Sequence, residues 1–221
     1  MAEQRDEGIG PFGLDRDAPS VEAYAATITG TLREELDRFG LPHPRLIVEP
    51  GRSIAGNVAV LLTRVGIVKT FPGVKTWVSL DASQNIMPNI VNLAYEYYAI
   101  AADRATAPAA EPVDLVGPLC SFDFLGRDRR LPPLRRDDLV AFLDTGAYCE
   151  SKALQFNALP RPASVMVSGG EADVVVERET LQDVIARHRL PARLLATGSS
   201  GAGPRVPPPA AAGRPASPVL P

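Results

Sequence analysis

The chain has 221 residues, of which 45% are hydrophobic and 22% are charged, and its formal net charge is −3. This is the composition of one large or two small globular domains, without the basic surface that nucleic acid requires or the apolar run of roughly 18 residues that spans a membrane. The 2 cysteines, Cys120 and Cys149, are far apart in the sequence, which disfavours a disulfide scaffold or zinc site and favours a reduced, cytoplasmic protein.

The first predicted element is an amphipathic helix over residues 21–39, after a polar segment that is expected to be a loop. Ser20 can cap this helix, and apolar residues follow at spacings of three and four. A short buried strand is expected at residues 46–48, and it is ended by the turn Glu49-Pro50-Gly51-Arg52. The order helix, strand and glycine turn predicts an α/β unit over residues 1–55.

Short apolar runs separated by Gly, Pro and Asp predict a mainly β region from about residue 55 to 178. Strands are expected at residues 58–69, 77–80, 113–116, 139–143, 164–167 and 174–176, the last two forming a hairpin around Ser168-Gly169-Gly170. A closing helix, capped by Thr180, is expected over residues 181–188. The Gly-, Ser-, Pro- and Ala-rich end is predicted to be disordered, so the domain boundaries are 1–55, 56–195 and 196–221.

Several segments carry residues with candidate chemistry. In Glu49-Pro50-Gly51-Arg52 the glycine lets backbone amides approach an anion, and the arginine can hold a phosphate through two hydrogen bonds. The alternative is a turn that ends a strand and exposes an arginine. Cys120 could be a nucleophile, a general acid or a packing residue. Tyr148 could donate a hydrogen bond to an anion, or lie at the edge of the core.

In their order and spacing these segments resemble the fold-type III pyridoxal-phosphate decarboxylases, the ornithine/diaminopimelate/arginine decarboxylase group, and within it the diaminopimelate-decarboxylase-like branch. The matching stretches are RLIVEPGRSIAG, LLTRVGIVK, WVSLDAS, VGPLCSFDFLGRDRRLPPLRRDDLVAFLDTGAY and FNALPRPASVMV, within roughly residues 20–195. The resemblance implies an α+β, mainly β fold. Residues 1–55 would be the remnant of a pyridoxal-phosphate-binding (β/α) barrel end. Residues 56–195 would be the β-rich C-terminal domain of the alanine racemase/decarboxylase type.

The resemblance implies a cofactor site for pyridoxal 5′-phosphate. Glu49 would face the pyridine nitrogen, so that the ring can withdraw electrons from the reacting carbon. Gly51 and Arg52 would hold the phosphate, and Tyr148 would also reach it. Cys120 would enter the active site of a partner subunit and help to protonate the product. The sites would therefore form at the interface of a homodimer.

The substrate positions depart from the branch pattern. Asp81, which opens the DAS motif, and Ser121 are the substrate-side candidates that the resemblance implies. The branch usually has glutamate where this chain has Ser121, and an Arg-Pro pair where it has Met87-Pro88. Without these charges the site is expected to reject meso-diaminopimelate, because buried substrate charges would remain unpaired. The substrate is then another small amino acid, or one attached to a carrier.

The largest departure is the missing barrel. A (β/α) barrel needs roughly 200 residues or more, but only about 50 precede the EPGR motif. The lysines are Lys69, Lys75 and Lys152, and none occupies the family's Schiff-base position. We therefore expect a C-terminal portion of an amino-acid decarboxylase that needs a partner chain or the missing barrel. The alternatives are a non-catalytic β-domain remnant that binds a partner, and a module that binds a phosphate ligand through Arg52 and Tyr148.

Overall fold

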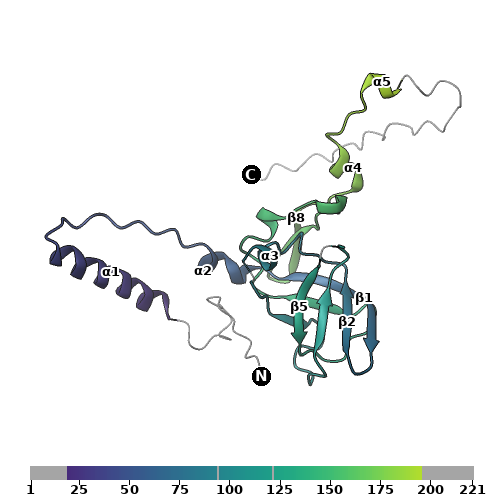
Figure 1. Ribbon diagram of the computed structural model, residues 1–221, viewed down its shortest axis with the longest axis horizontal. Coiled ribbons are helices and arrows are strands. Elements are labelled where there is room, and N and C mark those ends of the chain that lie inside the picture. Colours follow the sequence, from purple (N-terminus) through teal and green to yellow (C-terminus); the bar gives the residue numbers. More distant parts are fainter. Residues whose placement is uncertain (1–18, 94, 121, 196–221) are drawn as a thin grey trace, which may run out of the picture. The chain divides into compact units, whose positions relative to one another are not determined.

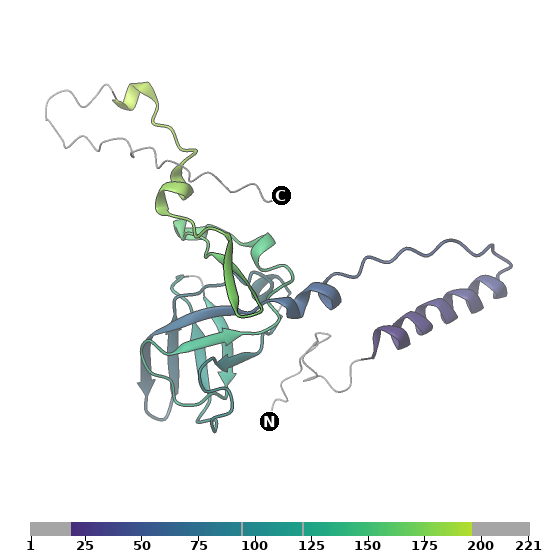
Figure 2. The same ribbon diagram turned by 180° about the vertical axis from the view of Figure 1, so that it is seen from behind.

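The structure is a computed structural model that describes residues 19–93, 95–120 and 122–195. The chain divides into two units, one up to Val184 and one from Ile185 onward. The first contains a curled six-stranded sheet, which Figure 1 shows from one side and Figure 2 from behind. The predicted tail over residues 196–221 lies outside the described residues, and the predicted domain boundaries remain predictions.

The sheet has the strand order β3-β6-β1-β2-β4-β5. Its strands are β1 (Leu61–Phe71), β2 (Lys75–Leu80), β3 (Ala99–Ala101), β4 (Val113–Val116), β5 (Phe124–Arg129) and β6 (Leu139–Phe142). Neighbouring strands are antiparallel except β2 and β4, which are parallel. The mainly β fold is confirmed, and so are the strands predicted near 58–69, 77–80, 113–116 and 139–143.

The long strand β1 explains how the sheet curls. Residues Leu61 to Arg64 pair with β6, whereas Val65 to Phe71 pair with β2. A bulge interrupts the register between Val65 and Val68, and a bulge increases the local bend and twist of a strand. The apolar side chains enclosed by this bend form the core. They are mainly Val65, Val78, Leu80, Met87, Tyr97, Leu115, Leu125, Leu131, Val140 and Phe142.

The predicted hairpin is confirmed as β7 (Ser164–Ser168) and β8 (Glu171–Val176), which pair in an antiparallel register. The turn between them needs glycine, because Gly169 has φ of 58° and Gly170 has φ of 89°. Nearly all residues of both strands are exposed, including a row of valines. This two-stranded sheet is separate from the six-stranded one.

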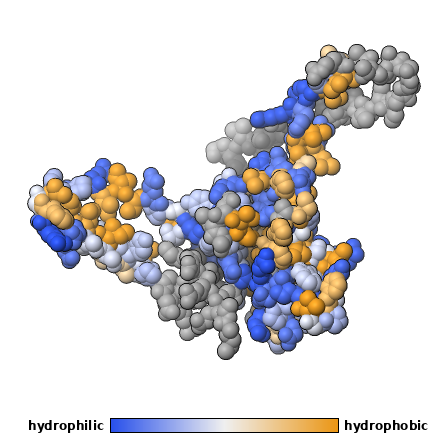
Figure 3. Space-filling view, viewed as in Figure 1, coloured by the Kyte–Doolittle hydropathy of each residue, from blue (hydrophilic) through white to orange (hydrophobic). Residues whose placement is uncertain are grey.

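The predicted first helix is confirmed as α1 (Val21–Arg38), with the Ser20 hydroxyl accepting a 3.1 Å hydrogen bond from the Ala23 amide. None of its residues is buried, and Figure 3 shows apolar side chains at its surface. The remaining helical elements are short. They are α2 (Arg52–Ala55), η1 (Gly56–Val58), α3 (Asn89–Leu93), η2 (Glu150–Lys152), η3 (Phe156–Ala158), α4 (Leu181–Ile185) and α5 (Ala192–Leu195).

Some sequence predictions of local structure are wrong. Residues 46–48 form no strand, and Ile47 is 73% exposed. A strand exists only through hydrogen bonds to a neighbouring strand, and no other described strand pairs with this segment. The closing helix is shorter than predicted, since α4 ends at Ile185. No helix in the described part of the chain is both long enough and apolar enough to cross a bilayer.

Candidate functional site

Two predicted motif segments, Glu49-Pro50-Gly51-Arg52 and Asp144-Thr145-Gly146-Ala147-Tyr148, are joined by the backbone next to them. The amide of Gly146 donates a 2.9 Å hydrogen bond to the carbonyl of Gly56, and the amide of Thr145 donates one of 3.1 Å to Ala59. A Cβ atom on Gly146 would lie 2.0 Å from the Ala55 carbonyl oxygen. Only glycine therefore allows the two segments to approach this closely.

The junction places Tyr148 against Gly51. A Cβ atom on Gly51 would lie 2.6 Å from the Tyr148 hydroxyl oxygen. The guanidinium carbon of Arg52 lies 5.6 Å from the centre of the Tyr148 ring and 4.1 Å from that of Tyr95. The structure thus brings Gly51, Arg52 and Tyr148 together, as a shared anion site requires.

Arg52 has unused hydrogen-bonding capacity. Its Nη1 atom is buried and has no hydrogen-bond partner among the described residues. Within the same residues, the guanidinium takes part in no ion pair. A buried donor without an acceptor is costly, and a phosphate or carboxylate placed beside it would remove that cost.

The side chains next to Arg52 form an uncharged, aromatic cluster. The rings of Tyr95 and Tyr97 meet edge to face with centres 4.7 Å apart. The Tyr97 hydroxyl lies 3.2 Å from the Cys149 sulfur, and both side chains are buried. Burial raises the pKa of Tyr97 and of Cys149, although the positive charge of Arg52 opposes this. Both groups therefore stay protonated near neutral pH and act by packing. In the sequence, the Tyr-Glu-Tyr-Tyr string at 95–98 is the signal that could have indicated this aromatic cluster.

Glu49 lies in an irregular, exposed segment before α2. No hydrogen bond or ion pair in the described part of the chain fixes its carboxylate beside Arg52 or Tyr148. The structure therefore does not connect Glu49 to Gly51, Arg52 and Tyr148 through any side-chain contact of the described residues. The role of Glu49 toward a pyridine nitrogen stays a prediction.

Cys120 lies in the loop between β4 and β5, with its thiol exposed and 3.8 Å from the Asn157 amide nitrogen. Buried Asp123 shapes this loop, because its carboxylate accepts hydrogen bonds from the amides of Gln84 (2.8 Å) and Leu119 (3.0 Å). Burial raises the pKa of Asp123, and the backbone hydrogen bonds act in the opposite direction. Asp123 is therefore a positioning residue that the sequence analysis did not identify.

Gly117 reinforces this loop, since a Cβ atom there would lie 2.1 Å from the Asp123 carboxylate and 2.6 Å from the Ala82 carbonyl. No contact among the described residues links Cys120 to Arg52 or Tyr148. Ser121, the adjacent substrate candidate, lies outside the described residues.

Asp81 follows β2, and its contacts reach back to β1. One carboxylate oxygen accepts hydrogen bonds from the Thr63 hydroxyl (2.5 Å) and the Arg64 amide (2.8 Å). These contacts are those of a brace between the strands, and the substrate role of Asp81 stays a prediction. Met87 is fully buried in the core. It therefore presents no charge to a substrate.

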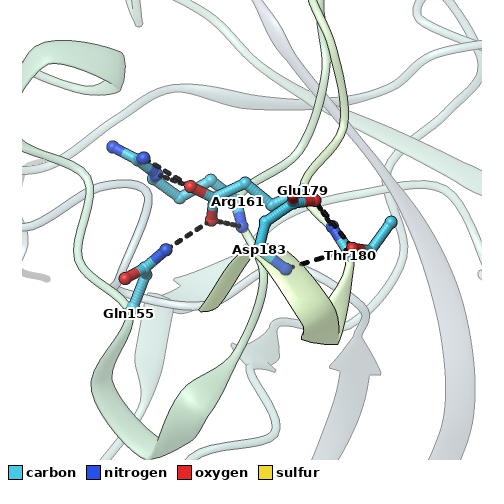
Figure 4. A network of polar contacts seen from close by, with 5 residues as sticks. All are labelled: Gln155, Arg161, Glu179, Thr180 and Asp183. Atoms are coloured by element: carbon cyan, nitrogen blue, oxygen red, sulfur yellow. Dashed lines mark hydrogen bonds and ion pairs between the residues drawn. The ribbon is translucent and has the colours of Figure 1, made fainter. Parts of the chain in front are cut away.

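A pocket of about 580 Å³ lies between the start of β1, the segment 145–153 and the base of the hairpin. At that base Glu179 accepts hydrogen bonds from Gln155 (2.7 Å) and from the backbone and side chain of Arg161, as Figure 4 shows. Arg161 is the main cause that lowers the pKa of Glu179 to about 2. At the start of α4 the Thr180 hydroxyl accepts a hydrogen bond from the Asp183 amide, and the Asp183 carboxylate accepts one from the Thr180 amide. We call the Gln155–Arg161–Glu179 group the hairpin clasp.

Comparisons with known proteins give a family and a coverage. Residues 24–146 match the family model described as "Pyridoxal-dependent decarboxylase, C-terminal sheet domain". The chain is 35% identical over 190 residues to the diaminopimelate decarboxylase of Methanothermobacter thermautotrophicus, covering 85% of this chain and 44% of that relative. It is 42% identical over 153 residues to the diaminopimelate decarboxylase of Archaeoglobus fulgidus, covering 69% of this chain and 36% of that relative. The chain thus spans less than half of these relatives.

Solved structures agree with the sequence comparison. The diaminopimelate decarboxylase of M. jannaschii is similar with a TM-score of 0.69 and 34% identity, over 81% of this chain and 41% of that one. For the structure of that enzyme in complex with L-lysine, the TM-score is 0.68 and the identity is 35%, over 80% of this chain and 40% of that one. For the diaminopimelate decarboxylase of Helicobacter pylori in complex with L-lysine, the TM-score is 0.62 and the identity is 28%, over 82% of this chain and 42% of that one.

Proposed function

Because the chain belongs to the pyridoxal-dependent decarboxylase family, whose C-terminal sheet domain it contains, we propose that it is the C-terminal portion of a diaminopimelate-decarboxylase-like amino-acid decarboxylase. The observation that carries this proposal is the meeting of Gly51, Arg52 and Tyr148 around a buried guanidinium nitrogen that lacks an acceptor. This arrangement fits the phosphate of pyridoxal 5′-phosphate, a dianion that takes several hydrogen bonds.

Each residue of the group has a distinct task. The absence of a side chain on Gly51 lets the backbone approach the phosphate, Arg52 supplies charge and a fork of donors, and Tyr148 supplies a hydroxyl. The cofactor, when bound, withdraws electrons from the carbon that loses CO₂. Glu49 is proposed to keep the pyridine nitrogen protonated, and Cys120 to donate a proton in a partner subunit's site. Asp123 holds the loop that presents Cys120.

The lysines of the chain support a need for another half. Lys75 is committed to Asp114 (3.1 Å) and Asp128 (2.8 Å), and these hydrogen bonds raise its pKa. A strongly protonated amine is a poor nucleophile toward an aldehyde. Lys69 lies over the Phe71 ring on β1, and Lys152 follows Tyr148. We propose that the anchoring lysine comes from a (β/α) barrel that this chain lacks.

The assembly follows from the same argument. The barrel would come from a partner chain or from the N-terminal half that the relatives carry, and two such units would form a homodimer in which each site uses Cys120 of the other. Exposed valines of β7 and β8 supply an apolar surface that such a partner could cover. The free thiols of Cys120 and Cys149 support a cytoplasmic location.

The substrate is proposed to be a small amino acid, free or attached to a carrier, other than meso-diaminopimelate. Met87 is buried and apolar where the related branch carries an arginine, so the far carboxylate of meso-diaminopimelate would lose a partner. The leading alternative function is a non-catalytic β-domain that binds a partner, and it is favoured by the same exposed hairpin.

The test has two parts. First, the purified chain is mixed with pyridoxal 5′-phosphate, reduced with borohydride and analysed by mass spectrometry, and no lysine adduct is expected. Second, it is co-expressed with the N-terminal half of the Methanothermobacter relative, and CO₂ release from a panel of amino acids is measured. Cofactor-dependent release that falls in the Arg52→Gln variant supports the decarboxylase proposal.

Two results would contradict it. A stoichiometric adduct on one lysine of the chain alone would show that no partner barrel is needed. A stable complex with the barrel half that releases no CO₂ from any amino acid would favour the non-catalytic alternative.

A further inference from the structure

Lys152 lies beside the candidate anion site formed by Gly51, Arg52 and Tyr148, and the family resemblance gives it no role. It ends η2, one helical turn after Tyr148 in the sequence, and its Nζ atom lies 6.0 Å from the centre of the Tyr148 ring. The Arg52 guanidinium carbon lies 5.6 Å from the same ring centre. Two cations therefore face one phenol side chain, and the phenol carries a hydroxyl that can donate to an anion.

Neither cation is neutralised within the described residues. Lys152 and Arg52 form no ion pair there. The acidic neighbour Glu150 instead accepts a 2.5 Å hydrogen bond from Ser164. Two positive charges beside one ring repel each other, and a bound anion would convert that repulsion into attraction.

Asn89 fixes Lys152 and provides the independent evidence for a ligand. Its side chain is 0% exposed, and its Oδ1 atom accepts a 3.0 Å hydrogen bond from Lys152 Nζ. Its Nδ2 donor is buried and has no partner among the described residues, which is also true of Arg52 Nη1. Buried donors without acceptors are rare in native proteins, and a bound ion is one of the partners that satisfies such donors. An oxyanion would supply acceptors for both.

We propose that Lys152, positioned by Asn89, completes an oxyanion-binding site with Arg52 and Tyr148. The occupant is either the phosphate of the cofactor or a carboxylate of the substrate, since both present the same kind of charged oxygen atoms. The inference deepens the proposed function and rests on it for the two candidate anions.

The test is a titration of the full ¹⁵N-labelled chain with inorganic phosphate, followed by the amide shifts of Gly51 and Tyr148 in NMR spectra. We expect millimolar binding that Lys152→Gln weakens by about tenfold, because one charged hydrogen bond is lost. Lys152→Arg keeps the charge and should stay within about threefold of the wild type. Lys69→Gln is the matched control, with the same charge change on β1, and should leave the binding constant unchanged.

Further titrations distinguish the two anion sources. If Lys152→Gln weakens the binding of pyridoxal 5′-phosphate but not of pyridoxal, the site takes the cofactor's phosphate. If glutarate still binds when phosphate is saturating, and Lys152→Gln removes that binding, the site takes a carboxylate.

The proposal is overturned if phosphate leaves Gly51 and Tyr148 unshifted, or if Lys152→Gln binds as the wild type does. Lys152 is exposed, so this variant should fold, and unchanged amide shifts across β1–β6 verify it. Wild-type binding by Lys152→Gln would remove only Lys152 from the site and leave the decarboxylase proposal intact. Unshifted Gly51 and Tyr148 amides would also count against the phosphate site on which that proposal rests, and CO₂ release tests the proposal separately.

Discussion

The six-stranded sheet and the β7–β8 hairpin are built from similar residues but use them differently. Valines of the sheet such as Val78 and Val140 are fully buried, whereas Val167 of the hairpin is 72% exposed. The hairpin is fixed locally by a glycine turn and by the hairpin clasp, while the sheet is fixed by its core. The contrast teaches that β-branched residues favour strands in both places, but only the sheet encloses its own apolar face.

The largest effect is expected from removing a core side chain of the sheet. Phe142→Ala should lower the free energy of unfolding by about 3–5 kcal/mol, because it removes a fully buried ring and leaves a cavity. Urea denaturation measures this. The matched control is Phe156→Ala in η3, whose side chain is 48% exposed and whose loss should cost less than about 1 kcal/mol. Equal costs for the two variants would remove the contrast.

The loop that presents Cys120 depends on the sheet through Asp123. Asp123→Ala should cost about 1–3 kcal/mol, because the amides of Gln84 and Leu119 lose their acceptor. Hydrogen exchange at the Leu119 amide and alkylation of Cys120 should both become faster. The exposed Asp103→Ala serves as the control and should change neither rate. An unchanged exchange rate in Asp123→Ala would show that the carboxylate does not hold the loop.

Helix α1 extends the comparison to an element with no buried residue. Ser20→Ala should destabilise this helix by about 1 kcal/mol, because the Ala23 amide loses its cap. Far-UV circular dichroism should show a small loss of helical signal, while the unfolding midpoint of the sheet stays the same. A matching loss of sheet stability would show that α1 and the sheet unfold together.

The smallest effect is expected from the hairpin clasp, and it depends on pH. Glu179 has a folded-state pKa of about 2 against an ordinary value of 4.5, mainly because of hydrogen bonds from Arg161. The clasp therefore stabilises the hairpin fully above pH 4.5 and loses this effect as the pH falls toward about 2. Carboxyl NMR titration should show that pKa, and Arg161→Gln should move it back toward 4.5. An unchanged pKa in that variant would contradict the account.

The pH dependence of stability that Asp123 contributes has the opposite sign to that of Glu179. Burial raises its pKa above 3.8, so its contribution is complete below that value and declines as the pH rises through the folded-state pKa. An Asp123→Asn variant should therefore flatten a pH dependence that runs against that of Glu179. The two carboxylates distinguish a buried anchor of the sheet from an exposed ion pair of the hairpin.

Much of the sheet could be predicted from the sequence, because its strands are short apolar runs between turn residues. The strands β3 and β5 were missed, since the small Ala99–Ala101 run and the charged Phe124–Arg129 run carry no such signal. The strand predicted at 46–48 was wrong, because periodicity cannot reveal whether a pairing neighbour exists.

The candidate site was accessible to sequence reasoning only in part. The motif resemblance nominated Gly51, Arg52 and Tyr148, and the structure brings them together. Asn89 and Lys152 could not be found in this way, because their contact joins residues 63 positions apart and neither lies in a motif position. Unsatisfied buried donors are visible only once the packing is known.

The parallel pairing of β2 and β4 has a consequence for the rate at which the chain folds. Residues 81–112 must leave one edge of this pair, place β3 against β6 and return before β4 can align. Contacts between distant parts of a sequence close slowly, because loop entropy is lost before they form. Asn89, Tyr95 and Tyr97 all lie in this excursion. In a refolding experiment phosphate binding should therefore appear with the slowest phase, after the β1–β2 and β7–β8 hairpins have formed.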